Sequence, residues 1–198
     1  MRADGIRRER IVSLIAATTI TVPERLTQSA ATFGTGTASG PLKRVDTEDA
    51  AIVTFRTDSG VLGPVTVARV SAGRKNRLWF EFDGEHCSAV FDQENSETIW
   101  LGSQTSAGIL NRDPSHGPPD QRRLSKLPAG HPQGYAQCFE NFIEDTYAAV
   151  RGEPREGLPT FDDGARSAHI IDAVLDSAKT GQWVTVTAPS PSVASEPA

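Results

Sequence analysis

The first half of the chain is built from short runs of apolar and β-branched residues, with alternating apolar and polar positions. Such runs, separated by Gly, Asp or Pro, predict an antiparallel β-meander. The segment at about 27–48 is instead rich in Ser, Thr, Ala and Gly, and we expect a long loop there. The predicted strands are residues 11–22, 50–56, 61–62 with 65–70, 77–82, 87–91 and 98–101.

The apolar spacing changes to that of a helix after a Gly/Pro-rich stretch over 102–130. One face of the next segment is apolar, which predicts a long amphipathic helix with Pro132 in its first turn. The predicted buried stripe consists of Tyr135, Cys138, Phe139, Phe142, Ile143 and Val150.

A second helix is expected to begin near Asp162 and Asp163, which can cap it and complement its dipole. Gly181 is expected to end this helix, and residues 182–186 to form a closing strand. The Ser/Pro-rich segment 188–198 is expected to be a disordered tail.

The succession of strands and then helices predicts the α+β class: an open, mostly antiparallel β-sheet with helices packed on one face. A chain of 198 residues that is 37% hydrophobic can form one substantial domain. We expect this domain over residues 11–187, preceded by an N-terminal arm of residues 1–10.

Charge and composition exclude several classes of function. A net charge of −5 argues against nucleic-acid binding, which needs a basic face. No apolar run approaches the length of a transmembrane helix and no signal peptide is completed, so the cytoplasm is the expected location. Cys87 and Cys138 are expected to be free, buried thiols, because neither belongs to a Cys-x-x-Cys pair that could hold zinc.

Known catalytic and cofactor motifs are absent from the sequence. The glycines at 34, 36 and 40 resemble a dinucleotide loop, but serine replaces the third glycine and Pro41 stands where a helix would begin. The Asp-x-x-His spacings at 83–86 and 113–116 are expected to be polar turns. We therefore predict no catalytic, cofactor-binding or metal-binding residue in this chain.

Two sites are candidates for binding a substrate. His131 is predicted at the N-terminus of the long helix, where a neutral imidazole can bond a ligand hydroxyl, and Tyr135 adds a phenol and a stacking ring. The alternative is that His131 caps the helix while Tyr135 packs beneath it. Arg74 and Lys75 form the second candidate, whose alternative is a solvated hairpin end.

Several segments together resemble the C-terminal domain of the Gfo/Idh/MocA (glucose-fructose oxidoreductase / inositol dehydrogenase) family. They match its "E-D-x-A-x-x-x-x-F…G" strand, its "N-x-x-x-x-E-x-x-G" hairpin, and its "HPxGY", "PTFxDG" and "SxxxGxWV" signatures, in the same order. The matching segments are residues 47–60, 73–84, 130–135, 159–164 and 177–184.

The resemblance implies a nicotinamide-dependent oxidoreductase, NAD or NADP, acting on a sugar-like molecule or polyol. In that family an N-terminal Rossmann domain binds the cofactor, and the C-terminal domain completes the substrate pocket and forms oligomer contacts. This sequence lacks the family's glycine loop, its "E-K-P" lysine and its "D-x-x-x-H" pair, since no aspartate is followed four residues on by histidine.

Three hypotheses follow from the resemblance. The chain supplies substrate contacts to a Rossmann partner on another chain; or it is a free-standing sugar-binding or oligomerisation module without catalysis; or it is a gene fragment. The first predicts turnover only when the partner is present, and the second predicts sugar binding without any nicotinamide.

The alternation within the predicted sheet places two tryptophans on the face away from the helices. Leu78, Phe80 and Phe82 are expected under the helices, so Trp79 faces away, and Trp100 does so on a neighbouring strand. Two exposed tryptophans are typical of an interface. We expect homo-oligomers through this face, unless the segment 27–48 folds back over it.

Overall fold

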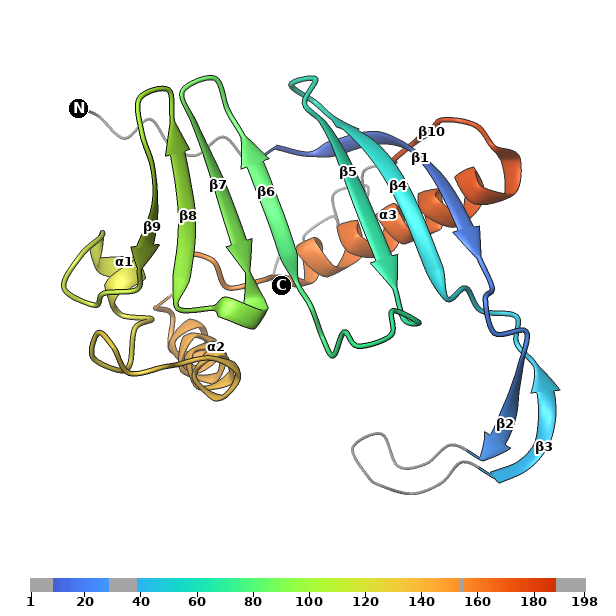
Figure 1. Ribbon diagram of the computed structural model, residues 1–198, viewed down its shortest axis with the longest axis horizontal. Helices are drawn as coiled ribbons and strands as arrows, with labels where there is room; N and C mark the ends of the chain where they lie inside the picture. The colour runs from blue at the N-terminus through green and yellow to red at the C-terminus, as the bar shows by residue number, and fades with distance from the viewer. Residues whose placement is uncertain (1–8, 29–38, 154, 188–198) are drawn as a thin grey trace, which may run out of the picture. The chain divides into compact units, whose positions relative to one another are not determined.

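The computed structural model describes residues 9–28, 39–153 and 155–187 (Figure 1). Within these ranges it contains ten strands and three α-helices, and every strand pairing is antiparallel, so the predicted α+β class is confirmed. The predicted tail 188–198 and most of the N-terminal arm lie outside the described residues. No helix in the described ranges is both long and apolar enough to cross a membrane.

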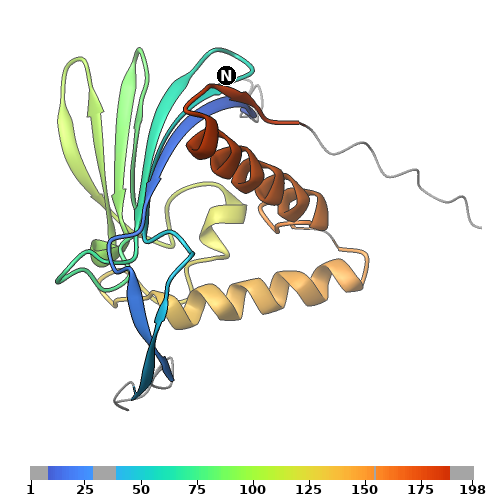
Figure 2. The same cartoon turned by 90° about the vertical axis from the view of Figure 1, so that its right-hand side faces the viewer.

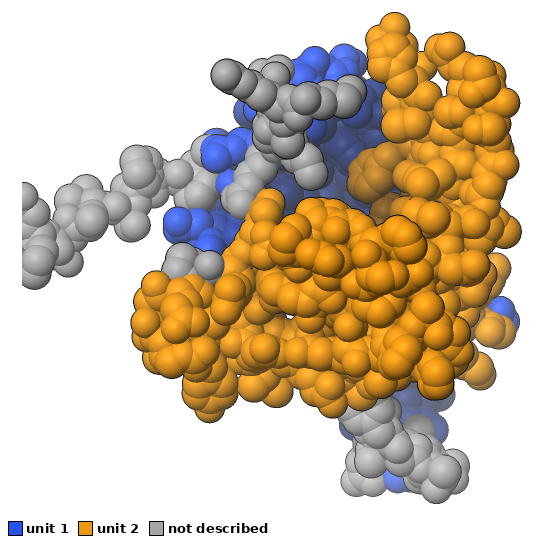
Figure 3. All heavy atoms as spheres, turned by 90° about the vertical axis from the view of Figure 1, so that its left-hand side faces the viewer, with its two compact units in different colours: residues 1–72, 160–198 blue, residues 73–159 orange. Residues whose placement is uncertain are grey.

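The chain divides into two compact units, coloured separately in Figure 3. Unit 1 comprises residues 1–72 and 160–198, and unit 2 comprises residues 73–159. Unit 1 contains a sheet in the order β10-β1-β4-β5. Its strands are β1 (Ile11–Thr19), β4 (Ala50–Thr57), β5 (Leu62–Ala68) and β10 (Val184–Thr185).

Helix α3 (Phe161–Thr180) packs along β1 in unit 1 (Figure 2). Its first turn is fixed by a capping box between Thr160 and Asp163, and Gly181 ends it with a φ of 67°, a value that glycine adopts without strain. The predicted start and end of this helix are confirmed. The core beneath it is small and consists of Leu14, Ala16, Val53 and Ala173.

The segment predicted as a long loop contains part of a β-ribbon. Strand β2 (Glu24–Gln28) pairs with β3 (Ser39–Arg44), so the loop prediction was wrong for residues 27–28 and 39–44, while residues 29–38 lie outside the described part. The expectation failed because composition marked the segment as polar, and polar residues also form exposed two-stranded ribbons. Every described residue of β3 is exposed.

Unit 2 contains a four-stranded meander in the order β6-β7-β8-β9. The first three strands match the predicted series, whereas the fourth falls inside the stretch that sequence alone marked as Gly/Pro-rich loop. A short helix, α1 (Pro119–Arg122), lies in the same stretch. The strands are β6 (Trp79–Asp83), β7 (Cys87–Asp92), β8 (Thr98–Ser103) and β9 (Ala107–Asn111).

Helix α2 (Tyr135–Val150) begins later than predicted and exposes its apolar stripe. Its N-cap is Gly134, so Pro132 lies outside the helix rather than in its first turn. Phe139, Phe142 and Ile143 are about half exposed, at 52, 49 and 52%. The prediction that this stripe is buried was wrong, because periodicity identifies an apolar face but not what covers it.

The apolar face of β6 is also less covered than predicted. Phe80 and Phe82 are 36 and 67% exposed, and Leu78 is 52% exposed. The expectation that these three side chains lie under the two long helices was therefore wrong. Helix α3 packs on β1 and β10 of its own unit.

Candidate functional site

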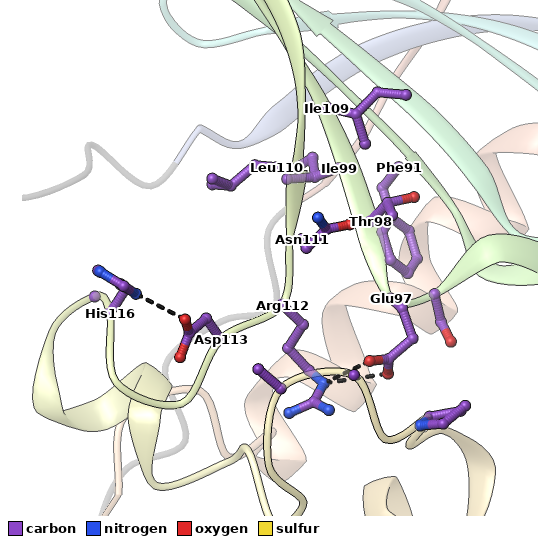
Figure 4. Close-up of a pocket in the computed structure, with 15 residues that line it drawn as sticks. Phe91, Glu97, Thr98, Ile99, Ile109, Leu110, Asn111, Arg112, Asp113 and His116 are labelled. Carbon is purple, nitrogen blue, oxygen red and sulfur yellow. Dashed lines mark hydrogen bonds and ion pairs between the residues drawn. The ribbon is translucent and has the colours of Figure 1, made fainter.

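The candidate site is a cavity of about 960 Å³ in unit 2, at the point where β8 begins and β9 ends (Figure 4). One wall is apolar and comes from Phe91, Ile99 and Leu110. Ala129, Gly130 and Pro132, from the segment before α2, also line the cavity, and the last two belong to the "HPxGY" signature. An apolar wall facing polar groups is the arrangement that small-molecule sites use.

An ion pair between Glu97 and Arg112 joins the start of β8 to the end of β9 at this cavity. Glu97 immediately precedes β8, and Arg112 immediately follows β9, with the Arg112 amide donating to the Glu97 carbonyl oxygen at 2.8 Å. The Arg112 Nε donates to both carboxylate oxygens of Glu97 at 3.1 Å. Both side chains are partly buried, which reduces solvent screening of the pair.

The same two side chains hold the backbone of the signature segment. Arg112 donates from its terminal nitrogens to the carbonyl oxygens of Leu127 at 2.8 Å and His131 at 2.8 Å, and more weakly to Pro128 at 3.3 Å. Glu97 Oε1 accepts from the Gln133 amide at 2.9 Å. The hydrogen bonds from the Arg112 side chain, and next the one from the Gln133 amide, hold the pKa of Glu97 below its usual value.

The Gln133 side chain holds the loop before α2 by hydrogen bonds to the backbone of residues 124–127. Its side-chain oxygen accepts from the Lys126 amide at 2.9 Å and the Leu127 amide at 3.3 Å, and its Nε2 donates to the Leu124 carbonyl oxygen at 3.1 Å. The loop before α2 is therefore closed by side-chain hydrogen bonds rather than by regular secondary structure.

His131 is exposed and lies before the helix, not at its first turn. Its amide donates to the Pro128 carbonyl oxygen at 3.2 Å, and its ring Nδ1 lies 3.4 Å from the Ala129 carbonyl oxygen. Because Gly134 is the N-cap, the prediction that His131 stands at the helix terminus was wrong, as was the alternative that it caps the helix. Pro132 and Gly134 delay the helix start.

Tyr135 is the first residue of α2 and is 74% exposed, so it does not pack beneath the helix. Its ring contacts that of Phe139, with centroids 4.9 Å apart. The phenol is therefore open to solvent near the start of the helix, four positions beyond His131.

Arg74 and Lys75 lie between β5 and β6 and are both exposed. Arg74 pairs with Glu94 at 2.9 Å, in the 3₁₀ turn η1 (Gln93–Asn95), while Gln93 donates to the Asn76 carbonyl oxygen at 2.9 Å. This turn leads directly into Ser96, whose hydroxyl donates to the Gln133 carbonyl oxygen at 3.3 Å. Arg74 and the segment that carries His131 are therefore both tied, through separate partners, to the stretch 94–97 between β7 and β8.

Trp79 and Trp100 share one face of the unit 2 sheet. The register pairs Trp79 with Asp92 and Val90 with Trp100, and residues two apart on β7 share a face. The two indoles are 45 and 38% exposed, and Ile109, directly opposite Trp100, is 69% exposed. These side chains form an exposed apolar patch, called the tryptophan patch below.

Asp113 and His116 also line the cavity, and the His116 Nδ1 lies 3.0 Å from an Asp113 carboxylate oxygen within a turn. Hydrogen bonds from the Ser115 hydroxyl and amide, in that order, lower the pKa of Asp113. The prediction that this Asp-x-x-His spacing is a polar turn agrees with the structure.

Glu97 and Arg112 were not singled out by sequence reasoning. The signal that could have found them is the opposite charge at the two ends of a hairpin, since residues just outside paired strand ends face each other. Recognising that Glu97 and Arg112 face each other requires the pairing of β8 with β9. The sequence prediction did not include β9, so this pairing was not available.

The N-terminus of α3 does not offer a phosphate site. A pyrophosphate binds at a helix N-terminus reached through a glycine loop, but the first turn of α3 carries Asp162 and Asp163, which repel phosphate. The glycine pattern at 34–40 lies largely outside the described residues. Within the described ranges, no group of three or more His, Cys, Asp or Glu side chains is placed to hold a metal ion.

Comparison with known proteins gives a consistent result. The model of an "oxidoreductase family, C-terminal alpha/beta domain" (Gfo/Idh/MocA) matches residues 13–186. Levoglucosan dehydrogenase of Pseudarthrobacter phenanthrenivorans is 30% identical over 175 residues, which cover 83% of this chain and 44% of the relative.

Solved structures agree with this match. An apo levoglucosan dehydrogenase has a TM-score of 0.77 at 27% identity, over 91% of this chain and 47% of that one. An oxidoreductase domain protein from Kribbella flavida has a TM-score of 0.72 at 26% identity, over 90% of this chain and 45% of that one. A levoglucosan dehydrogenase in complex with NADH and L-sorbose has a TM-score of 0.75 at 25% identity, over 90% of this chain and 45% of that one.

The chain therefore spans about half the length of the relatives that it matches. The match covers both units and includes all the segments that carry the family's signatures. The chain belongs to the Gfo/Idh/MocA family of oxidoreductases and corresponds to the C-terminal α/β domain of that family.

Proposed function

We propose that this domain is the substrate-side half of a nicotinamide-dependent sugar or polyol oxidoreductase, and that a Rossmann domain supplies the NAD or NADP. The observation that carries the proposal is the segment 127–133, which Arg112 and Glu97 hold by hydrogen bonds, which contributes Ala129, Gly130 and Pro132 to the cavity of unit 2, and which carries His131 between them. The relatives named for levoglucosan and NADH support the substrate class and the cofactor.

The roles of the proposed sugar-binding residues follow from their chemistry. A neutral His131 imidazole can donate to one sugar hydroxyl or accept from it, and the Tyr135 ring offers an apolar face to the C–H side of a sugar. We propose Arg74 and Lys75, which are both exposed, as cationic donors to the same sugar. No hydride or proton step is assigned to this chain, because its sequence lacks the family's "E-K-P" lysine and its "D-x-x-x-H" pair.

The exposed stripe of α2 supports a second component of the active enzyme. Phe139, Phe142 and Ile143 form an apolar helix face that is half open to solvent, and such a face is stabilised by docking against another surface. Relatives that are about twice as long provide a candidate for that surface, their remaining half. We propose that the Rossmann domain covers this stripe.

The first test measures cofactor binding by the isolated chain. We expect no energy transfer from its tryptophans to NADH or NADPH at micromolar concentrations, because neither a phosphate-binding loop nor the family's lysine is present. Micromolar affinity would refute the proposed division of roles. Turnover of a sugar by the chain without any Rossmann partner would do the same.

The second test uses the enzyme reconstituted with a Rossmann-domain partner. His131→Ala should raise KM or lower kcat/KM for the sugar by up to about tenfold, since one neutral hydrogen bond is worth about 0.5–1.5 kcal/mol. The melting temperature should barely change, because the side chain is exposed. His86→Ala, an exposed histidine in the β6–β7 turn, is the matched control.

The opposite pattern would contradict the proposal. A large loss of stability in His131→Ala with unchanged kinetics would assign the residue a structural role. Sugar binding by the chain alone, without turnover when a Rossmann partner is added, would favour the free-standing binding module instead.

A further inference from the structure

We infer that Glu97 and Arg112 are positioning residues for sugar recognition, which set the backbone path from which His131 projects. The inference rests on the function proposed above. Each donor nitrogen of Arg112 and each carboxylate oxygen of Glu97 is engaged within the protein. The pair therefore acts on a substrate through the segment that it holds.

The composition of the segment favours an external donor. Pro128 and Pro132 have no backbone N–H, so two of the seven residues over 127–133 cannot donate a backbone hydrogen bond. Its carbonyl oxygens at Leu127 and His131 receive their hydrogen bonds from the guanidinium of Arg112 instead. The Arg112 side chain thus supplies hydrogen bonds that regular secondary structure would otherwise provide.

Geometry makes arginine the required residue at this position. The planar guanidinium presents donors in fixed directions, so it can bond the Glu97 carboxylate on one edge and two carbonyl oxygens on the others. A lysine ammonium is a point charge and cannot span these partners. A misplacement of about 1 Å in a positioned group can cost on the order of a hundredfold in rate.

The first experiment measures order in the segment on the 198-residue chain itself. Amide hydrogen exchange is compared between wild type, Arg112→Lys and Glu97→Gln, with the exposed pair Arg155→Lys and Glu153→Gln as matched controls. We expect at least about tenfold faster exchange of the Gln133 and His131 amides in the two test variants. The controls should match wild type.

The second experiment measures substrate recognition in the enzyme reconstituted with its Rossmann partner, with levoglucosan as the probe. Arg112→Lys should raise KM for levoglucosan by about tenfold while KM for NAD stays unchanged. In a background that already carries His131→Ala, the same substitution should add less than about twofold, because both changes remove one interaction. Glu97→Gln, which preserves shape, carries the test if Arg112→Lys does not fold.

Each outcome is decisive. Unchanged exchange in both variants, or fully additive effects of Arg112→Lys and His131→Ala, would overturn the inference. Faster exchange with unchanged KM in Arg112→Lys, while His131→Ala raises KM, would overturn the inference and leave the proposed function standing. No effect of His131→Ala would overturn the proposed function, and the inference with it.

Discussion

Ser177 shows how one side chain can complete the backbone bonding of a sheet. It is fully buried on α3, donates from its hydroxyl to the Gln182 carbonyl oxygen at 2.6 Å, and accepts from the Ala16 amide at 2.9 Å. In the β1–β10 ladder, Ser13 pairs with Thr185 and Leu14 pairs with Val184, so the Ala16 amide lies beyond the end of this ladder. The serine of the "SxxxGxWV" signature is therefore a structural residue in unit 1.

Removing the Ser177 hydroxyl should lower the stability of the fold. Ser177→Ala leaves the Ala16 amide and the Gln182 carbonyl oxygen without this partner, and a buried unsatisfied group costs about 1–3 kcal/mol. The free energy of unfolding in urea should fall by that amount. Ser167→Ala removes an exposed hydroxyl from the same helix and should change it by less than about 0.5 kcal/mol. Equal effects of the two substitutions would contradict this assignment.

At the scale of elements, Asp49 connects the β2–β3 ribbon to the sheet of unit 1. Its carboxylate is buried just before β4 and accepts from the Thr21 amide at 2.9 Å and the Val22 amide at 2.8 Å, at the start of the ribbon. It also pairs with Arg25 on β2. The Val22 hydrogen bond foremost, then that from Thr21 and the Arg25 charge, lower the pKa of Asp49 against the opposing effect of its burial.

The lowered pKa predicts a definite dependence of stability on pH. Because the folded-state pKa lies below the unfolded value of about 3.9, the ionised group stabilises the fold above that value, and the benefit is lost as pH falls through the folded pKa. Wild type should therefore melt several degrees above Asp49→Asn at pH 7, and this difference should shrink on acidification below about pH 4.

The control for this prediction is the neighbouring carboxylate. Glu48 is exposed, so Glu48→Gln should melt like wild type across the same pH range. Melting curves followed by circular dichroism at several pH values provide the comparison. A constant difference between wild type and Asp49→Asn down to the lowest pH would be evidence against a role for the ionised carboxylate.

At the scale of the whole molecule, the tryptophan patch predicts self-association. We expect the purified chain to be a dimer or larger by light scattering, because the exposed indoles of Trp79 and Trp100 gain by leaving water. Trp79→Glu should shift it to monomer, since burying an unpaired carboxylate in an interface is unfavourable. Trp100→Glu should act in the same way.

The control is a tryptophan of the other unit. Trp183 is similarly exposed, at 47%, and lies beside Arg56 in unit 1, so Trp183→Glu should leave the assembly unchanged. A wild-type monomer at tens of micromolar would rule out the predicted association.

Features that arise from neighbouring residues were predictable from the chain. Strands β1 and β4 follow from runs of apolar and β-branched residues, and β6 follows from alternation, because the pleat of a strand points successive side chains to opposite faces. The end of α3 at Gly181 is equally local, since a left-handed residue there favours glycine. The order of the signature segments was enough to indicate the family.

The sequence by itself thus determined the α+β class, most of the strands and the family, because periodicity and capping involve residues a few positions apart. Only the tertiary structure decided what those elements touch. Arg112 reaches the His131 carbonyl oxygen across 19 positions, and Glu97 reaches the Gln133 amide across 36. The exposure of the apolar stripe of α2 could not be predicted from the sequence either, because an apolar helix face has the same periodicity whether it is covered or open to solvent.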